Sequence, residues 1–169
     1  MDRKLQKEIL KWLLGQAYRA ESHKKQLERR LARIRQEVDN PVGAIRYSSM
    51  PKAAATGNRM EDLVADLTEI ESEIMAQIKA VSGAKRQVME IIDFIPVHET
   101  ARQIFELRHI DFLDWYAVSE EIHMSRQQCA KYHREGLDIL IGYPEIQKKV
   151  ELAKPDYENW KARKNKVGI

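Results

Sequence analysis

The sequence is poor in residues that interrupt helices. Its 169 residues include only 7 glycines and 5 prolines, whereas charged residues make up 33% and hydrophobic residues 43%. Because few residues break a helix and many can solvate its outer face, this composition predicts a helix-rich protein. Aromatic residues make up only 7%, which argues against a large sandwich or barrel core. The expected fold class is therefore all-α.

Cysteine and long apolar runs are also scarce. The one cysteine, Cys129, excludes a disulfide within the chain and is typical of a reducing compartment. The N-terminal stretch MDRKLQKEILKWLLGQ mixes charges with apolar residues, so we expect no signal peptide. No apolar run approaches the roughly 20 residues that span a bilayer. We expect a cytoplasmic protein without a membrane partner.

No pattern in the sequence points to catalysis. A glycine-rich phosphate loop and a nucleophile motif are both missing, and the acidic residues have the spacing of solvated helix faces. The pair Ser48-Ser49 is better explained by turn chemistry than as a nucleophile. We therefore expect no enzyme, no catalytic residue and no cofactor.

One cysteine and three histidines could either form a zinc site or simply pack in the core. Cys129 and His133 are four residues apart, and His109 and His123 are further potential ligands. Structural zinc needs four ligands in tetrahedral array, for which one cysteine and scattered histidines are a poor set. Core packing is the favoured interpretation, and no metal is expected.

Two long helices are predicted in the first part of the chain, over residues 2–39 and 59–95. Apolar residues recur at three- and four-residue steps in both, and Pro41 and Pro96 mark their ends. The apolar stripe of the second helix follows a repeat close to 3.5 residues: Leu63, Leu67, Ile70, Ile74, Ile78, Val81, Val88, Ile92 and Ile95. Residues 40–58 collect turn-forming types and are predicted to be a loop.

The charges of the two helices suggest how they pair. The stretch 19–35 has seven basic and two acidic residues, net +5, whereas 61–73 has six acidic and no basic residues, net −6. An antiparallel coiled-coil hairpin over residues 1–96 would set these stretches side by side. This pairing is favoured over a DNA-binding role of the basic stretch. For Trp12-Leu13-Leu14, a buried hairpin end or a homodimer seam is favoured over a membrane contact.

Shorter elements follow Pro96. We expect helices over 97–110, from Asp114 or Trp115 to Ile122, and from Ser125 to Leu140, which together form a domain over 97–142. Residues 143–169 are predicted to be a basic tail, partly disordered beyond Trp160. The stretch 148–166 has a net charge of +4, and a phosphate clamp and a merely solvated tail are both open for it.

Residues 113–140, LDWYAVSEEIHMSRQQCAKYHREGLDIL, have the pattern of a helix-turn-helix. Val118 and Ile122 form the inner pair of the first helix, and His123-Met124 is the turn. Ser125 is the predicted N-cap of the second helix, with Gln128 completing a capping box. The buried stripe of the second helix is predicted to contain Cys129, Tyr132, Gly136 or Leu137, and Leu140.

The outer face of this second helix is the candidate DNA-binding site. Arg and Gln are the side chains that pair bidentately with guanine and adenine edges, and Lys and Arg also bind phosphates. The outward residues have no acid among them before Glu135, which favours an anionic partner. The candidate DNA-binding residues are Ser125, Arg126, Gln127, Gln128, Lys131 and Arg134.

Residues 99–140 resemble region 4 of sigma-70-type factors. The residues that carry the resemblance are Trp115, Glu121-Ile122 and Ser125-Arg126, preceded by the supporting segment ARQIFELRHID. Ser119 stands where alanine is usual and Cys129 where valine or isoleucine is usual, and both are small enough for a packed position.

Residues 45–140 also resemble prophage regulators of the RinA/ArpU type. They are more specifically similar to a phage family of unknown function with a YSxMP motif, here YSSMP at 47–51, followed by RMEDLVADL and the Ser-Arg-Gln-Gln opening. The resemblance implies activation of phage late or packaging genes in a bacterial host cell. It assigns Arg126, Gln127 and Lys131 to base edges and Gln128 to the DNA backbone.

The sequence thus predicts a phage or prophage transcription regulator that binds double-stranded DNA. A single helix-turn-helix offers little contact area, so we also expect a homodimer through the hairpin or help from host RNA polymerase. Two alternatives stay open: a small-terminase-like DNA-packaging protein, and a module that docks onto RNA polymerase without reading bases.

Overall fold

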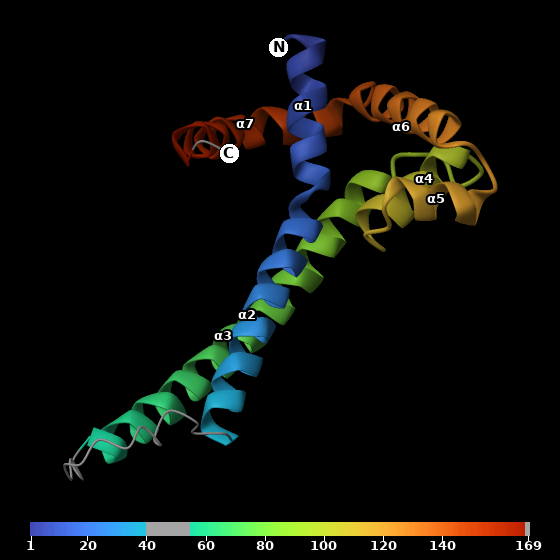
Figure 1. Ribbon diagram of the computed structural model, residues 1–169. Coiled ribbons are helices and arrows are strands. Elements are labelled where there is room, and N and C mark those ends of the chain that lie inside the picture. Colours follow the sequence, from blue (N-terminus) through green and yellow to red (C-terminus); the bar gives the residue numbers. More distant parts are fainter. Residues whose placement is uncertain (40–54, 168–169) are drawn as a thin grey trace. The chain divides into compact units, whose positions relative to one another are not determined.

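The chain is all-α, as the composition predicts. The computed structural model describes residues 1–39 and 55–167, and no strand occurs in those two stretches. The helices are α1 (Arg3–Leu14), α2 (Gln16–Asp39), α3 (Ala55–Ile92), α4 (Thr100–His109), α5 (Trp115–Ile122), α6 (Arg126–Ile141) and α7 (Pro144–Val167) (Figure 1). The YSSMP motif and Ser48-Ser49 lie outside the described residues, as does most of the predicted loop.

The helices form two compact units. The terminal unit contains Met1–Arg19 and Ser82–Ile169, so the two ends of the chain belong together. The inserted unit contains Ala20–Val81. This division differs from the predicted one, which assigned residues 1–96 to one hairpin domain and 143–169 to a separate tail.

The predicted single helix over residues 2–39 is wrong, because Gly15 separates α1 from α2. Gly15 has a turn conformation and its N–H still donates to the carbonyls of Lys11 and Leu13. The Arg19 guanidinium donates to the Trp12 carbonyl at 2.7 Å and lies over the Trp12 ring. A β-carbon on residue 15 would come within 2.9 Å of the Arg19 side chain, so glycine makes room for this contact.

The predicted tail over 143–169 is also wrong, since Pro144–Val167 forms α7. The helix contains Pro155 in its interior, and it buries a stripe made of Ile146, Val150 and Tyr157. Tyr157 packs edge-on against Trp12 of α1 and donates its hydroxyl to Glu8 at 3.1 Å. Burial of this stripe orders the segment despite its charge.

Smaller differences concern the ends of α3 and α4. The third helix begins at Ala55, within the stretch predicted to be loop, and ends at Ile92, before the predicted end at Ile95. The fourth begins at Thr100 and not at Val97, which is highly exposed. Ile78, placed in the predicted buried stripe, is 43% exposed.

The inserted unit has a narrow apolar seam between α2 and α3. Leu27, Ile34 and Ile70 are its buried residues together with Val81. Near one end of the seam, the Gln77 amide donates to the Ala20 carbonyl at 3.0 Å. Further along, Arg35 pairs with Glu71 at 2.7 Å, the one ion pair between the basic and acidic stretches among the described residues.

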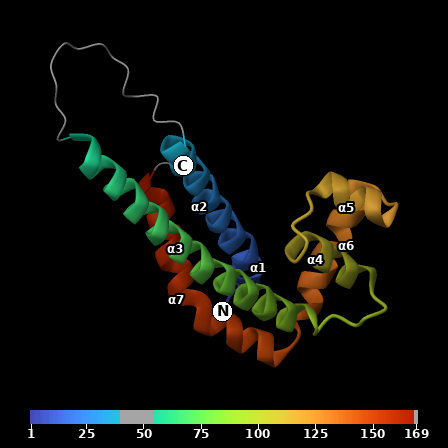
Figure 2. The ribbon, with the colours of Figure 1, turned by 90° about the horizontal axis from the view of Figure 1, so that it is seen from below.

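The core of the terminal unit joins helices from both ends of the chain. Ile9, Leu10 and Leu14 of α1 pack with the last turns of α3, with α4 and α6, and with the α7 stripe. A second, smaller cluster consists of Ile104, Val118 and Cys129 and links α4, α5 and α6. These three helices lie together in both ribbon views (Figures 1 and 2).

Candidate nucleic-acid interface

The candidate interface is built on α5, a tight turn and α6. The Asp114 side chain accepts from the N–H of Ala117 at 2.8 Å and so caps α5, which begins at Trp115, one of the two predicted starts. After Ile122, His123 adopts the left-handed conformation with φ 57°, and the Met124 N–H donates to the Ser119 carbonyl at 3.0 Å. The turn therefore ends α5 abruptly and redirects the chain into α6.

The predicted capping box at the start of α6 is confirmed. The Gln128 N–H donates to the Ser125 hydroxyl at 3.2 Å, and the Ser125 N–H donates to the Gln128 side-chain oxygen at 3.0 Å. The two bonds satisfy backbone donors that a helix otherwise leaves without partners. The first turn of α6, which carries Arg126 and Gln127, is thus held in a defined geometry.

The inner face of α6 packs much as predicted, with one addition. Cys129, Gly136, Leu137 and Leu140 are buried, and Val118 of α5 is fully buried in the cluster that contains Cys129. Tyr132 is only half-buried at the edge of the cluster, and so are Ile122 and Met124. The addition is Ile141 at the end of α6, while His133 is buried as the favoured core-packing interpretation expects.

The outer face of α6 displays the predicted DNA-binding residues. All of them are exposed to solvent: Ser125, Arg126, Gln127, Gln128, Lys131 and Arg134. Two are partly engaged, since Gln128 serves the capping box and Lys131 lies 3.8 Å from Glu135. Within the described part of the chain, Arg126 and Arg134 have no ion-pair partner. Their guanidinium groups are therefore free to meet an external anion.

Two neighbouring histidines, His133 buried and His109 half-buried, lie behind this face. The Nε2 atoms of His109 on α4 and His133 on α6 are 3.0 Å apart, and the His133 ring stacks on Phe105. Burial lowers the pKa of His109 to about 3, with further contributions from His133 and Arg108. Burial, Lys11 and Arg108 lower the pKa of His133 to about 4. Both rings are therefore neutral at physiological pH, and one donates its N–H to the other.

Gly136 lets α6 approach α4 closely. A β-carbon at this position would come within 2.6 Å of the Phe105 ring and 3.2 Å of the Ala101 side chain. Phe105 is fully buried, so its ring has little room to move. The close approach fixes α6 against α4. A surface that presents side chains in a defined arrangement requires such rigid support.

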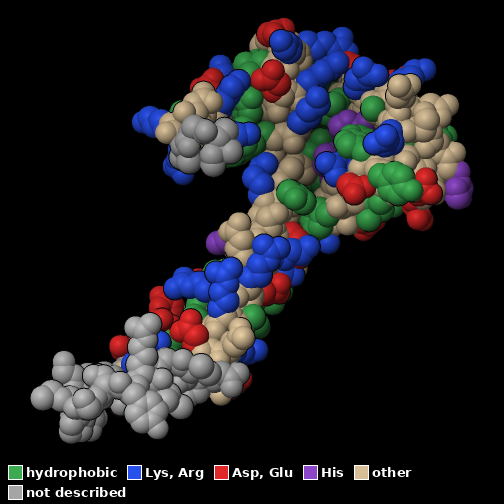
Figure 3. Space-filling view, viewed as in Figure 1, with side chains coloured by type: hydrophobic (Ala, Val, Ile, Leu, Met, Phe, Trp, Pro, Cys, Tyr) green, Lys and Arg blue, Asp and Glu red, His purple; other side chains and the backbone are tan. Residues whose placement is uncertain are grey.

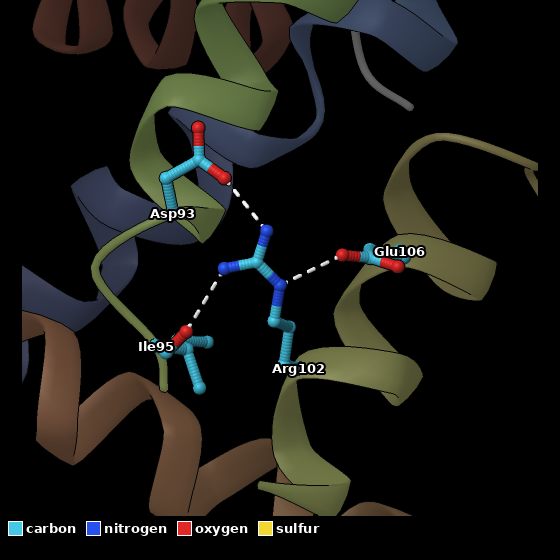
Figure 4. Close-up of polar contacts among 4 residues, drawn as sticks. All are labelled: Asp93, Ile95, Arg102 and Glu106. Atoms are coloured by element: carbon cyan, nitrogen blue, oxygen red, sulfur yellow. Dashed lines mark hydrogen bonds and ion pairs between the residues drawn. The ribbon is translucent and has the colours of Figure 1, made fainter. Parts of the chain in front are cut away.

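Arg102 ties α4 to the end of α3 (Figure 4). Its guanidinium donates to Asp93 at 2.7 Å, to the Ile95 carbonyl at 3.0 Å and to Glu106 at 2.9 Å. Hydrogen bonds to Asp93 and Glu106 raise the pKa of Arg102 above its ordinary value. Only Glu106 is a helical neighbour of Arg102, and the turn after α3 brings Asp93 and the Ile95 carbonyl to it, so the sequence pattern does not reveal this group.

Neither a metal site nor a membrane span is found. No group of three or more potential metal ligands gathers within residues 1–39 and 55–167. Cys129 is buried, and burial raises the pKa of its thiol. None of the helices in those stretches is long and apolar enough to cross a bilayer.

Comparison of the chain with family models, with curated proteins and with solved structures finds no match. The resemblance to phage regulators therefore rests on the sequence motifs alone.

Proposed function

We propose that this protein is a sequence-specific DNA-binding transcription regulator of phage or prophage genes. In this proposal α5, the turn at His123 and α6 form a helix-turn-helix, and α6 enters the major groove. The observation that carries the proposal is the two-sided character of α6. Arg126 and Gln127 are exposed on its capped first turn, while Cys129 in the next turn is fully buried.

The roles of the outer side chains follow from their chemistry. Arg126 and Gln127 are the side chains best suited to base edges, since both can form two hydrogen bonds with one base. Lys131 and Arg134, further along the same face, reach bases or phosphates. The first turn of α6 contains no acidic residue, and the positive end of the helix dipole lies there. The local field therefore favours a negatively charged partner.

We infer that the inserted unit is a helical hairpin that pairs with a second copy of the chain, because of the side chains that it exposes. Opposite charges lie on its two helices, and most stay exposed, because Arg35–Glu71 is the one cross-helix pair among the described residues. Apolar side chains on α3 are exposed as well: Met60, Val64, Met75 and Ile78. A second copy turned end for end would place its α2 bases against the α3 acids and cover these side chains.

The regulation of late or packaging genes, with or without host RNA polymerase, is the part of the proposal that rests on the sequence resemblance alone. A dimer would add a second reading helix, which increases contact area and selectivity. A large ring, measured as mass in solution, would instead favour a small-terminase-like packaging protein.

The decisive experiment is selection of bound DNA from a pool of random duplexes. It is done with the wild type, with Arg126→Ala/Lys131→Ala, and with Lys148→Ala/Arg163→Ala, at exposed positions of α7, as a matched control. We expect a defined motif for the wild type and the control and its loss in the α6 variant. No enrichment by the wild type would overturn base reading and direct attention to a polymerase-docking role.

A further inference from the structure

A second basic surface lies beside α6, on the first helix of the chain. Its members are Arg3, Lys4, Lys7 and Lys11, which we call the α1 basic face. Their spacing of one, three and four residues sets them on adjoining rows of one side of α1. Nothing in the sequence pattern of the helix-turn-helix points to this helix, because more than a hundred residues separate the two.

Two members of the α1 basic face hold α1 on α6. Lys7 pairs with Asp138 of α6 at 2.7 Å, and Arg3 pairs with the same carboxylate oxygen at 3.0 Å. These contacts lower the pKa of Asp138, so its charge is kept across the physiological range. The one carboxylate is shared by two bases, so positive charge is left over at this junction.

The other two members are available to an external anion. Lys4 and Lys11 are exposed and have no ion-pair partner in the described stretches of the chain. Lys11 is close enough to His133 to contribute to its lowered pKa, which places it next to the middle of α6. Arg134 follows His133 and is exposed. Lysine and arginine side chains gather over α1 and α6 on the face drawn in Figure 3.

Asp138 is the acidic group at this surface, and the carboxylate within α1 is directed away from it. The one glutamate of α1, Glu8, accepts from the Tyr157 hydroxyl at 3.1 Å and lies 3.6 Å from Lys161, both on α7. Of the bases of α7, Lys149 is paired with Glu90 and Lys154 with Glu158, whereas Lys148 and Arg163 are exposed without an ion-pair partner in the described stretches. What sets the α1 basic face apart from the bases of α7 is its direct contact with α6, because Arg3 and Lys7 are both joined to Asp138.

We propose that the α1 basic face binds the phosphate backbone of duplex DNA at the rim of the groove that α6 enters. The inference rests on the proposed function of α6 and extends it to a second, sequence-independent contact. From Arg126 to Asp138 the helix rises about 18 Å, whereas a major groove is about 12 Å wide. The end of α6 that holds α1 therefore lies where a sugar-phosphate strand passes when the first turn is in the groove.

The test is the salt dependence of DNA affinity for Lys4→Gln/Lys11→Gln. Binding is measured by titration at several salt concentrations, on the selected duplex and on a shuffled duplex. Each neutralised phosphate contributes a slope of about 0.9 to the plot of log affinity against log salt, so we expect the slope to fall by nearly 2. The affinity should drop by the same factor on both duplexes, because phosphate contacts do not distinguish sequences.

Lys148→Gln/Arg163→Gln is the matched control, since it removes the same charge from exposed positions of α7. We expect it to keep the wild-type slope. An unchanged slope for the α1 variant would overturn the inference, and so would an equal decrease in the control. Loss confined to the selected duplex would do the same, because it would mean base reading.

The two proposals can fail separately. If the wild type binds both duplexes equally and the α1 variant still lowers the slope, base reading by α6 is wrong and the phosphate contact stands. If the wild type prefers the selected duplex and the α1 variant changes nothing, base reading by α6 stands and the phosphate contact is wrong. A wild type that binds no duplex overturns both.

Discussion

The two units of this protein are built in different ways. In the terminal unit, helices contact one another from several directions, and Ile92, Phe105 and Leu140 are completely buried. In the inserted unit, two helices share one seam whose members keep a little exposure, such as 8% for Leu27 and 9% for Ile34. The terminal unit is therefore stabilised by packing from several sides, whereas the inserted unit keeps apolar and charged side chains exposed.

The tryptophans make this comparison measurable. All three, Trp12, Trp115 and Trp160, belong to the terminal unit. Tryptophan fluorescence thus follows unfolding of the terminal unit alone, whereas far-ultraviolet circular dichroism follows the helices of both units. Separate transitions in the two signals would show that the units unfold independently.

Mild acid should lower the stability of the terminal unit much more than that of the inserted unit, and this is the largest predicted effect. In the unfolded chain, His109 and His133 take up protons near pH 6.5, but in the folded protein their pKa values are about 3 and about 4. The stability that depends on their neutral rings is present above pH 6.5 and is lost as pH falls toward 4. Between pH 7 and 5 we expect a loss of about 2 kcal/mol per histidine in the terminal unit.

This loss is measured as the free energy of unfolding from tryptophan fluorescence in denaturant. His109→Gln/His133→Gln should flatten the dependence on pH, and His23→Gln/His98→Gln, at two exposed positions, should leave it unchanged. A wild type equally stable at pH 7 and 5 would contradict the expected role of the pair.

Arg102→Ala should have the next largest effect, again in the terminal unit. The substitution leaves Asp93, Glu106 and the Ile95 carbonyl without their shared donor. We expect a loss of about 2 kcal/mol, because hydrogen bonds to charged groups are stronger than neutral ones. The measurement is denaturant unfolding followed by fluorescence, and Arg102→Lys, which keeps the charge, should recover part of the loss. A loss below about 0.5 kcal/mol would show that the three contacts add little net stability.

Gly136→Ala should destabilise the terminal unit by about 1–2 kcal/mol. The added methyl group meets the buried Phe105 ring, which costs about 1–3 kcal/mol, and the helix preference of alanine offsets part of that cost. Gly83→Ala is the matched control, since a β-carbon there meets nothing within 4 Å. Fluorescence-detected unfolding should show that the control is at least as stable as the wild type. Equal effects of the two substitutions would refute the close approach of α4 and α6.

The smallest effect is expected in the inserted unit, for Arg35→Ala. Its ion pair with Glu71 is more than half exposed on both sides, so we expect a loss of at most about 0.5 kcal/mol. Circular dichroism during unfolding is the appropriate measurement, because no tryptophan reports on this unit. A loss above about 1 kcal/mol would mean that charge pairing, and not the seam, stabilises the inserted unit.

Local signals in the sequence were sufficient to predict α5 and α6. The caps at Asp114 and Ser125 and the apolar spacing of Val118, Cys129 and Leu140 depend on neighbours within a few turns. The predicted outer residues are exposed for the same reason, because burying one side of a helix determines the other. Their binding to DNA stays a prediction.

Features that depend on distant parts of the chain were missed. In α7, the spacing of Ile146, Val150 and Tyr157 is that of a buried stripe, but the surrounding charge suggested a tail. The glycines do not show by themselves where a helix ends, since Gly15 ends a helix whereas Gly83 lies inside one. Only the contact between Trp12 and Arg19 explains the difference, and spacing alone does not reveal it.

The pairing of α1 with α7 has a consequence for synthesis of the chain. Residues 1–19 leave the ribosome long before residues 144–167 exist, and yet each helix buries its apolar side partly against the other. Contacts so far apart in the chain close slowly, because a long loop must be ordered before they contribute. The N-terminal helix therefore waits with Ile9 and Leu10 incompletely covered until translation reaches the last helix. Transcripts or mutations that stop the chain before α7 would leave that apolar surface open to aggregation.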